Sequence, residues 1–155
     1  MSQAPVLAVL VLLLAQFAIG MAVNLYSHIA ADHPGAHPTN YFSGSVHSVG
    51  WAIGSGPATL AAHTALGLFL VIAAMIVVAL AIGTRRRATT VAAVLGAGFI
   101  IGAGFNGASF LDFNHDISSL IMSLLFALAA LAYIAVLALE ARCCRRLLGS
   151  AEQRA

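Results

Sequence analysis

Residues 98–123, GFIIGAGFNGASFLDFNHDISSLIMS, join two apolar segments through a short polar turn. The first segment carries a glycine every few residues, and the second is apolar again from Ile117 onward. The turn between them holds Asp112, Asn114, His115 and Asp116. A turn this short, between segments long enough to cross a bilayer, predicts a membrane hairpin with its tip at one surface.

The composition of the whole chain agrees with a membrane protein. Of its 155 residues, 61% are hydrophobic and only 8% are charged, so an ordinary soluble domain is excluded. All seven basic residues are arginines, most of them gathered at 85–87 and 142–146 beside apolar segments. Such clusters set membrane topology and contact lipid headgroups, and with a net charge of only +2 we expect no nucleic-acid partner.

These features predict an all-α integral membrane protein, a bundle of four transmembrane helices in a single domain that covers residues 1–155. The expected helices cover about 5–27, 57–83, 88–110 and 117–141. We expect the first to be a retained span, with a cleaved signal peptide as the alternative. One long extracytoplasmic loop joins the first two helices, and within it residues 41–53 are expected as a short helix or loop on the outer surface.

The arginine clusters also predict the orientation of the chain. Positive charge is retained on the cytoplasmic side of a membrane, so residues 85–87 and the tail are expected there. Both termini are then cytoplasmic, in a multi-pass protein of the plasma (inner) membrane. The lipid bilayer is the expected partner of the apolar surface.

The third expected helix is rich in small residues. Gly98 and Gly102 have the four-residue spacing that lets two helix backbones approach closely, and other glycines fall on further faces. We therefore expect this helix to be the most buried one, at the centre of the bundle. Homo- or hetero-oligomerisation through the same two glycines is a further expectation.

Histidines and an amide supply the candidate site. Gln16 lies in the middle of the first helix, where we expect its amide to hydrogen-bond a neighbouring helix. His63 lies six residues after Pro57, within the second span, and an ionisable group at such depth is a candidate functional residue. Imidazole ligates haem iron and transition metals, and Gly67 one turn away would leave room for a flat macrocycle. The structural alternative is that His63 only hydrogen-bonds across the bundle.

If the outer ends of the expected helices lie at the same depth in the membrane, further polar residues lie at the depth of His63. We expect an outer-face pocket in which haem b or a transition metal is held. Its expected cofactor-binding residues are His63, His115, His28, Asn106 and Gly67. Its expected metal ligands are His63, His115, Asp112 and Asp116, with Asn24 nearby. Helix capping by Asn114 or Asp116 is the alternative for the turn residues.

Three functions stay open on this sequence. The first is a haem- or metal-binding protein for electron transfer, and the second is a non-catalytic accessory or assembly subunit of a larger membrane complex. The third is a transporter or enzyme for a small lipophilic substrate, although no intramembrane charge pair is expected. No motif identifies a substrate or a reaction.

Overall fold

The computed structural model describes residues 2–113 and 116–152, and this part of the chain contains helices and no strand. The five helices are α1 (Ala4–Tyr26), α2 (Tyr41–Gly54), α3 (Ala58–Gly83), α4 (Arg87–Phe113) and α5 (Asp116–Glu152). Helix α4 continues three residues beyond its expected end, and α5 continues well past the expected residue 141. Pro57 is the N-cap of α3 and not its first residue.

Four of these helices are long and apolar enough to cross a membrane: α1, α3, α4 and the part of α5 from Ile117 to Arg142. Their mean hydropathy runs from 1.8 for α4 to 3.0 for α3. Large apolar side chains cover the outside of the bundle, for example Leu14 on α1 and Leu131 on α5. In water such a surface would be unstable, so the fold indicates a multi-pass membrane protein in contact with lipid.

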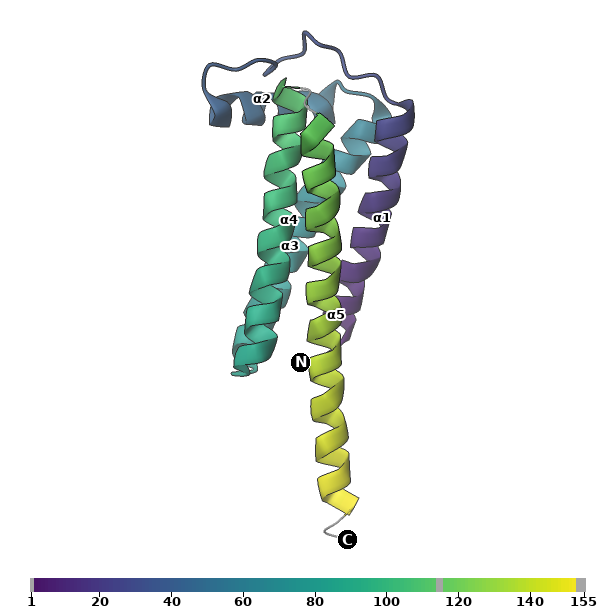
Figure 1. Ribbon diagram of the computed structural model, residues 1–155, viewed down its shortest axis with the longest axis vertical. Coiled ribbons are helices and arrows are strands. Elements are labelled where there is room, and N and C mark those ends of the chain that lie inside the picture. The colour runs from purple at the N-terminus through teal and green to yellow at the C-terminus, as the bar shows by residue number, and fades with distance from the viewer. Residues whose placement is uncertain (1, 114–115, 153–155) are drawn as a thin grey trace.

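The connection between α1 and α3 crosses one end of the bundle. Residues 27–40 form a loop there, and α2 lies across the same end at a steep angle to the spans (Figure 1). This end is called the α2 end below. The opposite end carries the turn between α3 and α4 with its arginines, and is called the arginine end.

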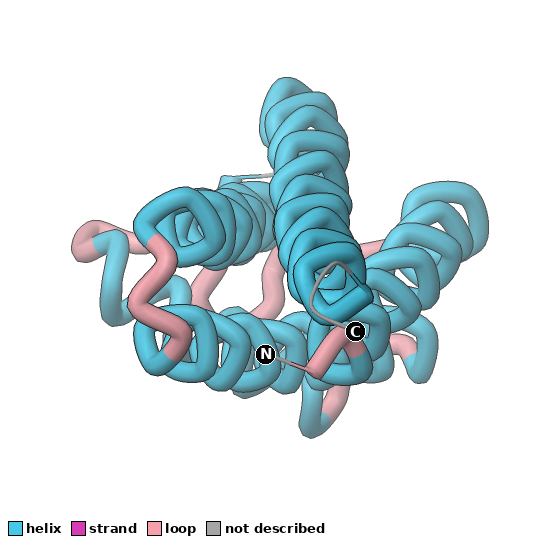
Figure 2. The backbone as a smooth tube through the Cα atoms, turned by 90° about the horizontal axis from the view of Figure 1, so that it is seen from below, coloured by secondary structure: helices cyan, strands magenta, loops and turns pink. Residues whose placement is uncertain are grey.

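The four spans form a ring with no central helix. Helix α1 packs on α3 and α5, and α4 packs on α3 and α5, while the backbones of the diagonal pairs do not come close to each other in the described part of the chain. Figure 2 looks along this bundle from the arginine end. Helix α4 has the largest buried share of the four spans, as expected, but the expectation that it lies at the centre is wrong.

The apolar core fills the half of the bundle nearest the arginine end. Its residues recur at spacings of three and four along every span, which is the pattern of helices that pack at a shallow angle. They are Val6, Val9 and Leu13; Leu70, Ala74, Val77 and Ala81; Ala93, Ala97 and Ile100; and Ala129, Tyr133 and Val136. Many are small because in lipid the contact between helices rests on close packing and not on expulsion of water.

Among the glycines of α4, the tightest contact with a side chain of α5 is at Gly96 and not at the pair expected from the sequence. A Cβ atom at Gly96 would lie 2.8 Å from Cε2 of Tyr133, so only glycine admits this fully buried ring. A Cβ at Gly102 would make an ordinary contact of 3.4 Å with Leu125, and one at Gly98 would meet nothing within 4 Å. A side chain at Gly98 would therefore point away from the described part of the bundle.

Candidate functional site

A cavity of about 260 Å³ lies between the four spans in the half of the bundle nearest the α2 end. All four spans contribute to its wall, and Ile29 and Val49 from the connecting segment close its outer end. It begins where the apolar core ends, since Leu13, Leu70, Ile100 and Ala129 belong to both. The cavity therefore lies at bilayer depth inside the protein.

Small residues account for this open volume. The wall contains two glycines from α1 and α3, and a group of glycines and alanines from α4: Gly20, Gly67, Ala103, Gly104, Gly107 and Ala108. Helices held apart by large side chains elsewhere leave a gap where their facing residues lack side chains. Of the α4 glycines, Gly104 and Gly107 thus line a cavity, whereas Gly98 and Gly102 lie outside its wall.

One wall of the cavity is polar. Gln16 of α1 donates from Nε2 to the backbone carbonyl of His63 on α3 at 3.1 Å, and the same nitrogen lies 3.2 Å from Nε2 of the imidazole. The expected hydrogen bond from Gln16 to a neighbouring helix is therefore confirmed. Because the amide donates to both atoms, the imidazole accepts at Nε2 and carries its proton on Nδ1.

The Gln16–His63 pair is built into the contact between α1 and α3 by two glycines. A Cβ at Gly20 would lie 2.8 Å from Cε1 of His63, and a Cβ at Gly67 would lie 3.1 Å from Nε2 of Gln16. Each polar side chain thus rests on a glycine of the opposite helix. The space beside Gly67 that was expected to admit a macrocycle is occupied by the amide of Gln16.

Two atoms of this pair are buried and have no hydrogen-bond partner within the described chain. They are Oε1 of Gln16, an acceptor, and Nδ1 of His63, which carries the proton. Buried polar atoms without partners are rare in proteins and costly in lipid, where no solvent replaces the missing bond. The polar wall is thus incompletely satisfied by the protein itself.

The other expected site residues lie in different places. Gly67 and Asn24 line the cavity with His63, but Asn106 does not, and its amide donates to the carbonyl of Gly102 on its own helix. His28 is exposed and also lies outside the cavity wall. His115 lies outside the described residues, and Asp116 is described only as the start of α5.

Asp112 is an anchor for α2 and is almost fully buried, although it was expected as a metal ligand. Ser48 donates to its Oδ1 at 2.6 Å and Ser45 donates to its Oδ2 at 2.9 Å. The backbone amide of His37 also donates to the carbonyl of Asp112 at 2.8 Å. Both carboxylate oxygens are thus engaged in holding the connecting segment on the end of α4.

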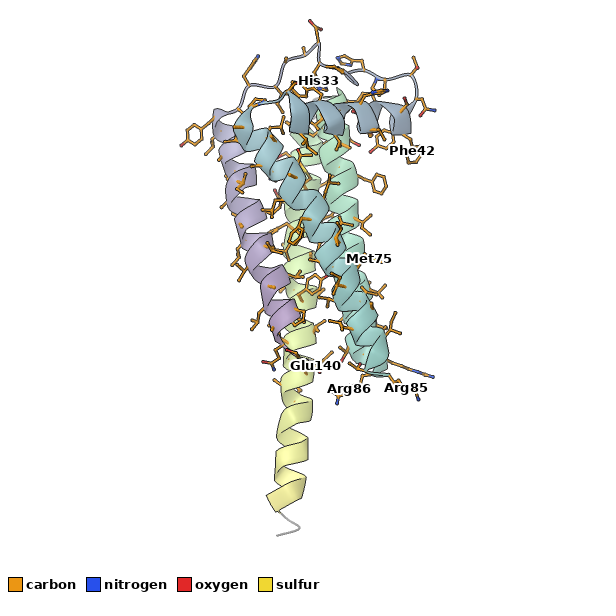
Figure 3. All side chains as sticks on the ribbon, turned by 180° about the vertical axis from the view of Figure 1, so that it is seen from behind. His33, Phe42, Met75, Arg85, Arg86 and Glu140 are labelled. Carbon is orange, nitrogen blue, oxygen red and sulfur yellow. The ribbon has the colours of Figure 1, made fainter. Side chains whose placement is uncertain are left out.

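A second contact of the connecting segment involves His33. Its Nε2 lies 3.0 Å from the carbonyl of Leu111, and its ring stacks on Trp51 with centroids 4.3 Å apart. Figure 3 shows His33 beside α2 at this end of the bundle. His33 is buried and joins the loop to α4, so its role in the described structure is structural.

Among the described residues, no three His, Cys, Asp or Glu side chains come together in a way that could hold a metal ion. His63 is the one imidazole of the described residues in the cavity wall. The described geometry therefore gives no support to the expected metal-ligand set.

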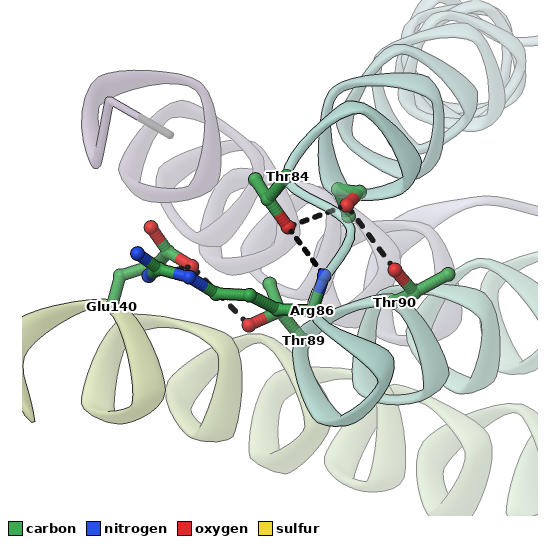
Figure 4. Close-up of polar contacts among 6 residues, drawn as sticks. Thr84, Arg86, Thr89, Thr90 and Glu140 are labelled. Carbon is green, nitrogen blue, oxygen red and sulfur yellow. Dashed lines mark hydrogen bonds and ion pairs between the residues drawn. The ribbon is translucent and has the colours of Figure 1, made fainter. Parts of the chain in front are cut away.

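The arginine end holds a polar cluster that sequence reasoning missed. Glu140 of α5 is buried, and its Oε1 lies 3.4 Å from Nη1 of Arg86 and accepts from the hydroxyl of Thr89 at 3.2 Å (Figure 4). Thr84 and Thr90 both donate to the carbonyl of Ala81 in the same turn. This charge pair lies at the end of the spans, since Arg86 belongs to none of them, and it ties α5 to the start of α4.

Comparison with known proteins identifies no relative. No family model matches the chain, and neither a curated protein nor a solved structure is significantly similar to it.

Proposed function

We propose that this protein binds a small lipophilic molecule in the cavity between its four spans. The observation that carries the proposal is an apolar cavity of about 260 Å³ at bilayer depth whose wall includes the Gln16–His63 pair. Binding pockets for small molecules are typically apolar with a few polar groups that orient the ligand. This choice develops the third function left open by the sequence.

The volume limits the size of the ligand. An apolar cavity of roughly 150 Å³ accommodates benzene, and pockets for drug-sized ligands begin at roughly 300 Å³. The observed volume lies between these values. It suits a molecule of one or two rings, or one segment of a longer lipophile.

The polar wall suggests the chemistry of one end of the ligand. A hydroxyl group can donate to Oε1 of Gln16 and accept from Nδ1 of His63, so it complements the two atoms without partners. Both atoms are covered by protein, so this contact requires both side chains to turn toward the cavity. The proposed ligand is therefore an alcohol or phenol with an apolar body.

The contact between α1 and α5 supports direct access from the lipid. Phe17 and Phe126 line the cavity and stack across this contact with ring centroids 5.0 Å apart. Phe17 is also exposed on the outside of the bundle, and so are Met21 and Ser123 of the cavity wall. A rotation of the two rings would join the cavity to the bilayer.

Three expectations from the sequence stay proposals beside ligand binding: the orientation in the plasma membrane, oligomerisation, and haem or metal binding. The plasma membrane and cytoplasmic termini rest on the arginines of the sequence. Of these, Arg85 and Arg86 lie at the same end of the bundle as the start of α1 and the end of α5. Packing of Gly98 and Gly102 against another protein is supported only by the exposure of Gly98. For haem b or metal binding in the cavity, His63 is the one imidazole that the described wall offers as a ligand.

The test compares molecules that copurify with the protein. Protein purified in detergent is extracted with organic solvent, and the extract is analysed by mass spectrometry. The parent is compared with Gly104→Leu, which places a side chain on the open side of a cavity glycine, and with Gly98→Leu, an equivalent change outside the cavity.

We expect a lipophilic compound enriched in the parent and Gly98→Leu and depleted in Gly104→Leu. Identical extracts from all three would overturn the proposal. An absorbance spectrum with and without dithionite distinguishes the haem version, which predicts a Soret band that His63→Ala removes.

A further inference from the structure

The structure points to a second surface with a different partner, the exposed apolar stripe of α2. Four apolar residues of this helix recur at spacings of four, three and four: Phe42, Val46, Val49 and Ile53. At 3.6 residues per turn these positions fall on one face. The solvent-exposed fraction is 69% for Phe42 and 71% for Val46, so this half of the stripe is not covered by the protein.

The two other faces of α2 have different surroundings. Gly44, Ser48 and Ala52 are buried against the bundle and the loop, and Ser45 and Ser48 are hydrogen-bonded to Asp112. Ser43, His47, Gly50 and Gly54 form an exposed face that is polar or bears no side chain. A helix with a fixed face, an apolar stripe and a polar stripe is suited to the boundary between lipid and water.

The position of α2 puts the exposed half of its stripe above lipid. The helix projects sideways past α4 in both opposite views, and Phe42 lies on the projecting end (Figures 1 and 3). Tyr41 extends along α4 from this end, since its hydroxyl donates to the carbonyl of Phe105, seven residues before Asp112. Seven residues correspond to about 10 Å of helix, so Tyr41 spans the corner between the two helices.

The flank of α4 below this corner is apolar and exposed. Phe105 is 50% exposed and Ile101 is 37% exposed, and both belong to a candidate membrane span. A molecule that fills the corner between α2 and α4 must contact apolar side chains on both sides. Because the span places its flank in hydrocarbon, the leaflet lipids of the α2 end are continuous with this corner.

We propose that α2 is an interfacial helix whose Phe42 and Val46 insert into the bilayer leaflet at the α2 end. The occupant of the exposed stripe is thus the acyl and glycerol region of lipid. Helix α2 contains no Asp, Glu, Lys or Arg, so insertion rests on apolar contact and does not depend on headgroup charge.

The test measures lipid and water access at single nitroxide labels. In a background of Cys143→Ser and Cys144→Ser, one cysteine is introduced as Val46→Cys or His47→Cys, and the labelled protein is reconstituted into phosphatidylcholine vesicles. Electron paramagnetic resonance then compares relaxation by oxygen, which concentrates in lipid, with relaxation by a water-soluble nickel chelate. Phe42→Cys repeats the measurement if Val46→Cys does not fold.

We expect the label at 46 to be relaxed mainly by oxygen and the label at 47 mainly by nickel. Adding phosphatidylglycerol to the vesicles should change neither result. Equal nickel access at both positions would show that the stripe faces water. Dipolar broadening at position 46 would show that a second copy of the chain covers it, and either result would overturn the proposal.

Discussion

Replacing Asp112 by alanine should release α2 from the bundle while the spans stay folded. The change removes the acceptors of two serine hydroxyls and leaves Ser48, which is fully buried, without a partner. A hydrogen bond to a charged group contributes roughly 1.5–3 kcal/mol. Taking the higher value for the buried Ser48 and the lower one for the half-buried Ser45, the local free energy of opening should fall by about 4.5 kcal/mol.

This loss is measurable as amide hydrogen exchange in α2. Since about 1.4 kcal/mol corresponds to a factor of ten, exchange within residues 45–54 should accelerate by roughly 10³. The interiors of the four spans have their own backbone hydrogen bonds and should exchange as in the parent. Asp112→Asn keeps an acceptor for one serine and should show a smaller acceleration, which makes it the matched control.

Two results would refute this reasoning. Unchanged exchange in α2 would mean that the serine–carboxylate contacts do not hold the helix. Equal acceleration in the spans and in α2 would mean that Asp112 supports the whole fold and not one attached element.

Further predictions concern other contacts and the orientation of the chain. Gly20→Ala forces a Cβ to within 2.8 Å of the His63 ring and should lower the free energy of unfolding by about 1–3 kcal/mol, as overpacking does. Gly98→Ala has open space around it and should leave thermal stability equal or slightly higher; equal melting temperatures for both variants would contradict the packing account. Glu140→Ala removes a buried acceptor and should cost about 2 kcal/mol in thermal unfolding, whereas E140Q should recover part of it; no loss would show that the cluster is not structural. For topology, a cysteine introduced at His37 in a Cys-free background should react with an impermeant maleimide added outside cells, and labelling only after lysis would reverse the proposed orientation.

The span count and the helical class were accessible from the sequence because hydropathy over 20 or so residues is a local property. The sequence also predicted that Gln16 bonds a neighbouring helix, because an amide in the hydrocarbon region needs a hydrogen-bond partner. Its identity as His63, and the role of Gly20 in receiving that ring, depend on how α1 and α3 are aligned. No local pattern encodes that alignment.

The anchoring contacts were misread because their partners are distant in sequence. Asp112 lies 64 positions from Ser48, and Glu140 lies 54 positions from Arg86. From the sequence, Asp112 is adjacent to the turn with His115, so a shared metal was the natural interpretation. Only the path of residues 27–54 over the end of the bundle brings the serines to the carboxylate.

The binding of a fluorinated aromatic alcohol tests the central proposal most directly. 4-(Trifluoromethyl)benzyl alcohol has one ring and one hydroxyl, and ¹⁹F NMR reports its binding to protein in lipid nanodiscs, with empty nanodiscs as the baseline. We predict saturable binding to the parent and to Gly98→Leu, and its loss in Gly104→Leu, because only the last change occupies the cavity. Absence of saturable binding to the parent, or equal binding to all three proteins, would contradict a ligand site between the spans.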